Sequence, residues 1–189
     1  MYRKYFKRLL DIIFSLLLIV ILLPVFAVTG IICKIVDKQV FFFQKRDGLH
    51  KKSFTIYKFC SMKNINGNYL ERTTKITRII RNLGLDELPQ LINILKGDMS
   101  FIGPRPFITG EPLELTPKDI IYKVRPGLIS LAIAKGRRKV SYKNRLKYDE
   151  EYVKNVTFKT DVKILFTTLY MLVKQNLEVT YGRNNKKNI

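Results

Sequence analysis

The segment IIFSLLLIVILLPVFAVTGIIC, residues 12–33, contains no charged residue and decides where the chain sits. An uncharged stretch of this length is typical of a transmembrane helix. Pro24 stands near its middle, where it removes a backbone hydrogen bond and bends or breaks the helix. The arm before the proline, residues 12–23, would rise only ~18 Å. That is shorter than the hydrocarbon core of a bilayer, which is ~30 Å thick.

Basic residues flank this segment on both sides: Arg3, Lys4, Lys7 and Arg8 precede it, and Lys34, Lys38, Lys45, Arg46, Lys51 and Lys52 follow it. Positively charged flanks favour the cytoplasmic side of a membrane. Both flanks can lie there only if the helix enters the membrane, turns at Pro24 and returns to the same face. We therefore expect a re-entrant membrane helix over residues 1–38, with a proline-kinked ordinary span as the alternative. Asp11 is expected to pair with Lys7 or Arg8, since a lone carboxylate at the membrane boundary would be costly.

The composition indicates a folded, strongly basic protein. The chain has 189 residues, of which 47% are hydrophobic, so it can form one domain with a core. Lys and Arg total 35 against 15 Asp and Glu, a formal net charge of +20. Such a surplus indicates a polyanionic partner, which could be nucleic acid, an anionic membrane or a phosphorylated substrate. Because His50 is the single histidine, we set aside catalytic triads and metal sites that depend on several histidines.

The remaining pattern predicts an α/β fold that is mostly α. Residues 40–44 and 53–59 are rich in aromatic and β-branched side chains and lie on either side of Asp47 and Gly48, which predicts a β-hairpin. Residues 73–83 carry isoleucines and leucine at helical spacing and are followed by Gly84, which predicts a helix that ends there.

Two further helices are expected nearer the C-terminus. Residues 113–119 predict a helix capped by Thr116, and residues 159–175 predict an apolar helix that lies either in the membrane interface or in the core. We expect a catalytic domain over residues 39–157, followed by an interface helix and a basic tail over 158–189.

Asp86 and Glu87 form a compact acidic pair between arginines. Asp86 at the start of a helix is most simply an N-cap, and Glu87 could complement the helix dipole. The neighbouring arginines indicate more than capping: Arg81 lies five residues upstream, and prolines on both sides restrict the backbone of Arg105. Guanidinium groups bind phosphoryl oxygens in pairs, and an aspartate can act as a nucleophile. The cluster therefore predicts phosphate chemistry.

The stretch LDELPQLINILKGDMSFIGPRP, residues 85–106, resembles the signature of the bacterial sugar transferases. These are monotopic phosphoglycosyl transferases that start polysaccharide or glycoconjugate assembly on a polyprenyl phosphate carrier. Further matches are KRLLD at 7–11, IYKF at 56–59, RPG at 125–127 and the glycine–arginine pair at 136–137. The resemblance implies a re-entrant helix and a small catalytic domain on the cytoplasmic face of the bacterial inner membrane.

The resemblance also implies residue roles. Asp86 would be the nucleophile that attacks the β-phosphate of a UDP-sugar, expels UMP and carries a phosphosugar before its transfer to undecaprenyl phosphate. Glu87 would be its partner, and the two carboxylates together would bind Mg²⁺. Arg81, Arg105 and Arg137 would hold the phosphates. The implied partners are the UDP-sugar, undecaprenyl phosphate and membrane lipid, with no nucleic acid.

The sequence departs from the family pattern at several places near these residues, among them Gly84 for a common Ser and Thr77 for a common Gly. Cys60 stands where the family usually has Arg or Lys, and Ile133 stands where it usually has Gln. Substrate recognition close to Arg137 is therefore expected to differ.

Two alternatives follow from the same sequence. A membrane-tethered basic adaptor would bind anionic lipid or nucleic acid through its charge and perform no catalysis. It would gain nothing from the carboxylates that lie among the arginines. An inactive member of the family is the other alternative, although Asp86, Glu87 and the GPRP segment are all present in the sequence.

Overall fold

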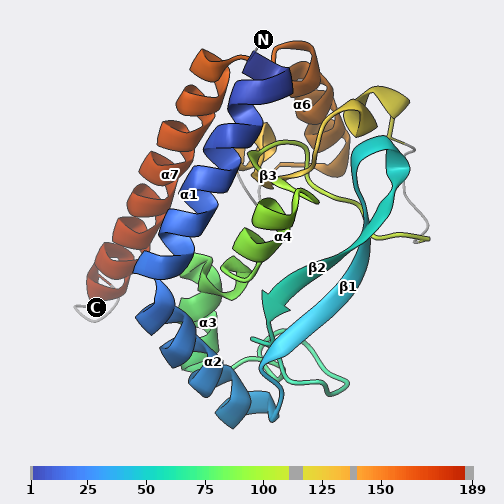
Figure 1. Cartoon of the computed structure of the whole chain (residues 1–189). Helices are drawn as coiled ribbons and strands as arrows, with labels where there is room; N and C mark the ends of the chain where they lie inside the picture. Colours follow the sequence, from blue (N-terminus) through green and yellow to red (C-terminus); the bar gives the residue numbers. More distant parts are fainter. Residues whose placement is uncertain (1, 111–116, 137–139, 186–189) are drawn as a thin grey trace.

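The computed structural model describes residues 2–110, 117–136 and 140–185. The chain is mostly helical and has two small two-stranded sheets, as expected for an α/β fold that is mostly α (Figure 1). Thr116, the expected cap of a helix over 113–119, lies outside the described residues. The described chain that follows forms a 3₁₀ helix, η4 (Asp119–Lys123).

The apolar segment forms two helices, α1 (Lys7–Ile21) and α2 (Leu23–Asp37), which are bent by 67° relative to each other. A short π-helix, η1 (Tyr2–Phe6), precedes them. The break falls at Leu22, and Pro24 lies in the first turn of α2. A proline is tolerated there because the backbone N–H groups of a first helical turn have no partner within the helix. No single described helix is long and apolar enough to cross a membrane, whereas this bent pair meets both criteria together.

The N-terminal end of the helix pair is bonded to the rest of the protein. Lys7 Nζ lies 2.6 Å from Asp161 Oδ2, and Arg8 donates to the backbone oxygens of Ile94 and Leu95 at 2.5 and 2.8 Å. These oxygens belong to the last turn of α4 (Gln90–Lys96), where a cation is favourable.

The expected direct pairing of Asp11 with Lys7 or Arg8 does not form in the described chain, although both cations lie close enough to act on its carboxylate through their charge. Asp11 is buried, and its Oδ1 accepts hydrogen bonds from Ser100 Oγ and from the backbone N–H of Phe101, both at 3.1 Å. Neutral donors satisfy this carboxylate because Lys7 and Arg8 are engaged by Asp161 and by α4.

The C-terminal end of the helix pair is also bonded to the rest of the protein, through residues that follow β2 (Ser53–Phe59). Asp37, the last residue of α2, accepts hydrogen bonds from the Cys60 thiol at 3.1 Å and from the Asn64 backbone N–H at 2.8 Å. Cys60 is buried, and burial followed by the hydrogen bond to Asp37 raises the pKa of its thiol to about 11. The thiol therefore stays protonated at neutral pH and remains a donor.

The predicted β-hairpin is confirmed. Strands β1 (Phe41–Asp47) and β2 (Ser53–Phe59) are antiparallel and are joined through η2 (Leu49–Lys51). Phe41 pairs with Phe59 at one end and Asp47 with Ser53 at the other, so β1 is longer than the aromatic run at 40–44.

A second sheet pairs β3 (Ser100–Ile102) in parallel with β4 (Gly127–Ile129). Gly103 and Gly127 lie against each other beside it. A Cβ atom on Gly127 would meet the nitrogen of Gly103 at 2.1 Å, and one on Gly103 would meet the oxygen of Arg125 at 2.5 Å. Glycine is required at both positions because the two backbones approach so closely. This contact holds the GPRP segment against the RPG segment.

The other helices complete the domain. They are α3 (Lys75–Leu83), η3 (Leu85–Glu87), α5 (Leu131–Gly136), α6 (Tyr142–Lys154) and α7 (Phe158–Asn185). One core cluster joins β3, α5, α6 and α7 and contains Ile102, Val124, Ala134, Tyr152, Val153 and Ile164. A second joins β2 and α4 and contains Ile56, Leu91, Ile94 and Met99, with Leu18, Ile19 and Phe26 of the helix pair packed against it. The helix pair is therefore part of the packed structure.

Several helices expose apolar side chains. On α3, Ile80 is buried while Ile76, Ile79 and Leu83 are exposed. On α7, Asp161, Ile164 and Thr168 are buried while Phe166, Tyr170 and Val173 are exposed. One face of α7 thus belongs to the core, and its opposite face is apolar and uncovered.

Candidate active site

A tight turn presents the acidic pair. Helix α3 ends at Gly84 as predicted, with a φ of 75° that favours glycine, and the 3₁₀ turn η3 follows at once. Asp86 is not an N-cap, contrary to the simplest prediction. Helix α4 begins four residues later at Gln90 and has no side-chain cap. The Asp86 carboxylate turns instead toward Ser61 and Arg81, so it is available for chemistry.

Asp86 and Glu87, called the dyad below, are held by different neighbours. Ser61 Oγ donates to Asp86 Oδ2 at 3.1 Å and accepts from Arg81 Nη1 at 3.0 Å. Arg81 Nη1 also lies 3.4 Å from Asp86 Oδ2. Glu87 Oε1 accepts from Lys58 Nζ at 2.7 Å. Each carboxylate of the dyad thus has its own cation.

The environment of Asp86 raises the pKa of its carboxyl above the ordinary range. Burial is the largest cause, and the neighbouring charge of Glu87 adds to it. Arg81, Lys58 and the hydrogen bond from Ser61 act in the opposite direction. Burial removes water from the carboxylate and makes it a stronger base, while the nearby cations favour its charged form.

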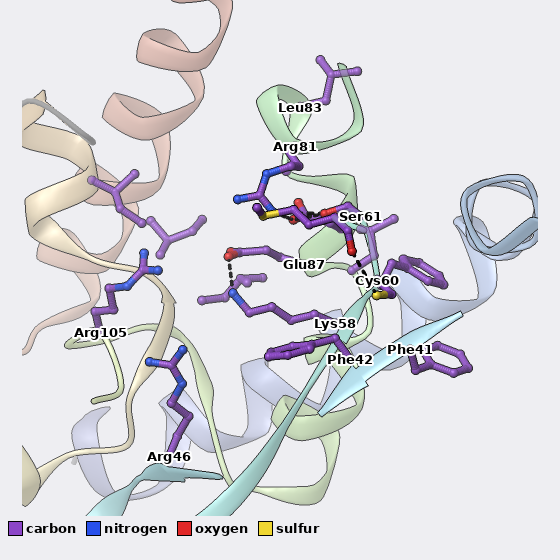
Figure 2. A pocket seen from close by; sticks show the side chains of 18 of the residues that line it. Phe41, Phe42, Arg46, Lys58, Cys60, Ser61, Arg81, Leu83, Glu87 and Arg105 are labelled. Carbon is purple, nitrogen blue, oxygen red and sulfur yellow. Dashed lines mark hydrogen bonds and ion pairs between the residues drawn. The ribbon is translucent and has the colours of Figure 1, made fainter. Parts of the chain in front are cut away.

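The dyad lines a pocket of about 1010 Å³, called the main pocket below. Its cations are Arg46, Lys58, Arg72, Arg81, Arg105 and Arg145. Its apolar lining includes Phe41, Phe42, Phe43, Leu128, Ile129, Ile133, Leu169 and Leu172. Figure 2 shows the guanidinium groups of Arg46 and Arg105 directed toward the Lys58–Glu87 pair. Cations in this excess over two carboxylates favour an anionic ligand, and the apolar wall suits a ligand with an apolar part.

Asp149 lies close to two of these arginines. This α6 residue is fully buried, and neither of its carboxylate oxygens has a hydrogen-bond partner of normal geometry in the described chain. Burial raises its pKa to about 7, and the backbone N–H of Arg105 and the charges of Arg145 and Arg105 oppose that rise. Arg145 precedes Asp149 by one helical turn, so both lie on the same face of α6.

The structure brings four of the predicted site residues together. Asp86, Glu87, Arg81 and Arg105 all line the main pocket. Arg137 lies outside the described residues. Ile133, the site of a departure from the family pattern, lines the main pocket.

Sequence reasoning assigned no role in the site to Lys58, Ser61, Arg46 or Arg145. Lys58 and Ser61 come from the end of β2 and the loop after it, 29 and 25 positions before their partners in the dyad. No spacing rule links residues so far apart. For Arg46 the sequence holds one weak signal, which is its position just after the aromatic run of β1. The alternation of side chains in that run alone indicates only an edge strand.

The dyad fits a magnesium ion only together with a phosphorylated ligand. Mg²⁺ is commonly bound by one or two carboxylates plus substrate phosphates and water. Asp86 and Glu87 supply two such carboxylates at the pocket wall. Across residues 2–110, 117–136 and 140–185 no group of three or more His, Cys, Asp or Glu residues is placed to hold a metal. The remaining ligands would have to come from the substrate and water.

Comparison with known proteins decides the family. A family model described as bacterial sugar transferase matches residues 2–175. The chain belongs to the bacterial sugar transferase family. It is 38% identical to the sugar transferase EpsL of Bacillus subtilis, over 92% of this chain and 91% of EpsL. It is 32% identical to the exopolysaccharide production protein ExoY of Sinorhizobium fredii, over 86% of this chain and 83% of that protein.

The name of a longer relative states the reaction that this relative catalyses. The undecaprenyl-phosphate galactose phosphotransferase of Salmonella typhimurium is 33% identical, over 92% of this chain but 41% of that enzyme. This chain therefore spans less than half the length of that relative. The predicted family is confirmed, and with it the prediction of an enzyme of the phosphoglycosyl transferase class. Membership of an enzyme family decides against the alternative of a basic adaptor without catalysis.

Proposed function

We propose that this enzyme transfers a sugar 1-phosphate from a UDP-sugar to undecaprenyl phosphate, with Asp86 as covalent nucleophile and UMP as the released product. The observation that carries the proposal is the buried Asp86 carboxylate beside Arg81, in a pocket lined by further arginines. Relatives from Salmonella, Klebsiella and Aeromonas are named as transferring different sugar phosphates to undecaprenyl phosphate. The acceptor is their common substrate, and we leave the sugar open.

In the first step, an Asp86 carboxylate oxygen attacks the β-phosphorus of the UDP-sugar. A bond forms between this oxygen and phosphorus, and the bond from the β-phosphorus to the bridging oxygen breaks. UMP leaves with that oxygen and its electron pair. The sugar phosphate remains as an acyl phosphate on Asp86.

In the second step, a phosphate oxygen of undecaprenyl phosphate attacks the same phosphorus. The acyl phosphate bond breaks, which restores the Asp86 carboxylate and forms undecaprenyl diphosphate sugar. Two steps allow UMP to leave before the lipid phosphate enters the same site. The product would be the starting lipid for polysaccharide or glycoconjugate assembly.

The surrounding residues have separate roles in this scheme. Arg81 and Ser61 orient Asp86, and Arg81 and Arg105 neutralise phosphoryl oxygens as charge shifts during transfer. Lys58 holds Glu87 in place. Asp86 and Glu87 would hold Mg²⁺ together with the diphosphate, and the bound metal would supply charge neutralisation at the phosphates. Arg137 would add a further phosphate contact.

Membrane association fits the same proposal. The acceptor is a lipid, and the outer side chains of α1 and α2 are apolar and exposed, among them Ile13, Leu17, Val20, Val28 and Ile31. We place the helix pair in the cytoplasmic leaflet as a re-entrant hairpin, with the exposed apolar faces of α3 and α7 at the interface. The main pocket would then face the cytoplasm, where UDP-sugars are made.

Trapping of the intermediate tests the mechanism. Purified protein is incubated with UDP-sugars that carry a radiolabel in the sugar, without lipid acceptor. The wild type should become labelled and release UMP in equal amount. Asp86→Asn should give no labelled protein and background transfer while it remains folded, and Glu87→Gln should be strongly impaired. If no labelled protein forms while transfer to lipid proceeds, Asp86 is a base or metal ligand in a direct transfer.

A further inference from the structure

A second, much smaller cavity of about 20 Å³ opens beside the dyad and is called the small cavity below. A volume of about 10–15 Å³ is enough for one water-sized group. The small cavity therefore accommodates a single oxygen atom or water. Its polar lining consists of Gln90, Arg46, Lys58, Glu87, Arg105 and Ser130, and its other lining is largely apolar.

Gln90 stands out among these residues. Its side chain is 97% buried, since its exposed fraction is 3%. Its amide nitrogen Nε2 has no hydrogen-bond partner within the part of the chain that the structure describes. A buried donor without a partner destabilises a fold, so such a group indicates a ligand that is bound during function.

The charges around the small cavity select an anionic oxygen over a neutral one. Arg46, Lys58 and Arg105 all line it, against the single carboxylate of Glu87, which already accepts from Lys58. Arg46 is fixed in place by hydrogen bonds to Gln44 and to the backbone oxygen of Pro106. Ile56, Leu128 and Ile133 form apolar lining, and low polarity strengthens the attraction between the cations and an anion.

The small cavity and the main pocket share several lining residues. Arg46, Lys58, Glu87 and Arg105 line both. A tetrahedral phosphate could therefore place one oxygen in the small cavity while its phosphorus and other oxygens stay in the main pocket.

We propose that the small cavity is a subsite for one phosphoryl oxygen, and that Gln90 Nε2 donates a hydrogen bond to that oxygen. Gln90 is then a substrate-binding residue that fixes the orientation of a phosphate next to Asp86. This inference deepens the proposed function and rests on it, because it assigns a place to one oxygen of the diphosphate.

The test uses inorganic pyrophosphate as the probe, with binding measured by calorimetry on the detergent-solubilised full chain, once with Mg²⁺ and once in EDTA. Gln90→Met keeps the length of the side chain and removes the donor, and Gln90→Glu keeps its shape and adds a repelling charge. Loss of a hydrogen bond to a charged group predicts about tenfold or more weaker binding for Gln90→Met. We expect a larger loss for Gln90→Glu.

Thr29→Val is the matched control. Thr29 is also a buried polar residue, and it lines neither the main pocket nor the small cavity. Its binding of pyrophosphate should stay within about twofold of the wild type, since it loses no phosphate contact. Circular dichroism confirms that each variant is folded. If Gln90→Met does not fold, Gln90→Glu alone tests the subsite.

Three results would overturn the subsite. They are unchanged binding by a folded Gln90 variant, an equal loss in Thr29→Val, and absence of pyrophosphate binding by the wild type both with Mg²⁺ and in EDTA. A trapped water in the small cavity would give the first of these. Sugar phosphate transfer by the same wild-type preparation is measured separately, so failure of the subsite and failure of the proposed function are distinguished.

Discussion

Two buried carboxylates, Asp86 and Asp149, lie close to arginines that line the main pocket. Asp86 contacts Ser61 and Arg81 and lines the pocket, whereas Asp149 lies near Arg105 and Arg145. Burial raises the pKa of both carboxyls. A buried carboxylate without good hydrogen bonds weakens a fold, so its presence beside binding residues indicates that it is retained for function. We infer that Asp149 holds Arg105 and Arg145 in position through its charge.

Replacement of Asp149 by Asn should change how stability depends on pH. The folded-state pKa of about 7 lies above the ordinary value of 3.8, so the folded state keeps this proton longer than the unfolded state. The stability that results is fully present below pH 3.8 and is lost as pH rises through about 7. An amide does not titrate, so only the wild type loses this stability as pH rises. The free energy of unfolding of Asp149→Asn, relative to that of the wild type, should therefore increase by about 2–3 kcal/mol from pH 5 to pH 8.

Denaturant unfolding followed by circular dichroism at the two pH values measures this difference. Asp149→Asn should also raise the KM for the UDP-sugar at pH 8, because Arg105 and Arg145 lose their counter-charge. The exposed residue Glu151, on the same helix, provides the control substitution Glu151→Gln. An Asp149→Asn effect on stability that is equal at pH 5 and pH 8 would show that Asp149 does not titrate in this range.

At the scale of elements, local patterns were predicted well and distant pairings were not. The hairpin followed from aromatic and β-branched residues at 40–44 and 53–59, and the end of α3 followed from Gly84. Strand β1 nevertheless extends beyond the predicted run to Asp47, because Lys45 and Arg46 also pair with β2. The parallel pairing of β3 with β4 joins two three-residue strands that are far apart in the chain, and strands so short carry no periodicity.

The candidate site divides in the same way. Asp86, Glu87, Arg81 and Arg105 could be found because they lie in one short stretch of sequence. Lys58 and Arg145 reach the same pocket through the hairpin and α6, so only the tertiary fold identifies them. The capping role expected for Asp86 failed because Asp86 lies inside the 3₁₀ turn η3 and α4 begins only at Gln90, and its carboxylate accepts from Ser61 instead.

The contact between Gly103 and Gly127 predicts a strong effect of one methyl group. In Gly103→Ala the new Cβ would lie 2.5 Å from the oxygen of Arg125, so the backbones must separate. Overpacking of this kind costs about 1–3 kcal/mol. It would also displace Arg105, two residues further on, so transfer activity should fall along with the melting temperature.

Gly30→Ala is the control for this prediction. Its new Cβ would meet Val40 and Phe59 at 3.4 and 3.5 Å, which is ordinary contact, and the position is helical. Thermal unfolding by circular dichroism should show little change for Gly30→Ala and a clear decrease for Gly103→Ala. Equal melting temperatures for the two variants would mean that the close approach of the two glycines is not needed.

At the scale of the whole molecule, the contacts at the two ends of the helix pair limit its topology. Lys7 and Arg8, at the start of α1, bond to Asp161 and to the last turn of α4, whereas Asp37, at the end of α2, bonds to Cys60 and Asn64. All these partners belong to the same packed domain (Figure 1). A span that crossed the membrane would place its ends ~30 Å apart on opposite sides of the hydrocarbon core. The two sets of bonds could not then form together, and for this reason we propose a re-entrant hairpin, which keeps both.

Cysteine labelling tests this topology. Lys4→Cys, Lys38→Cys and the control Lys147→Cys, at an exposed position on α6, are made separately and exposed to a membrane-impermeant maleimide in spheroplasts. The native Cys33 and Cys60 are buried, so they should contribute little background. We expect all three positions to resist labelling in sealed spheroplasts and to react after permeabilisation, because they share the cytoplasmic side. Labelling of Lys4→Cys or Lys38→Cys from outside, with Lys147→Cys still protected, would establish an ordinary span. It would require the bonds at one end of the helix pair to break in the membrane.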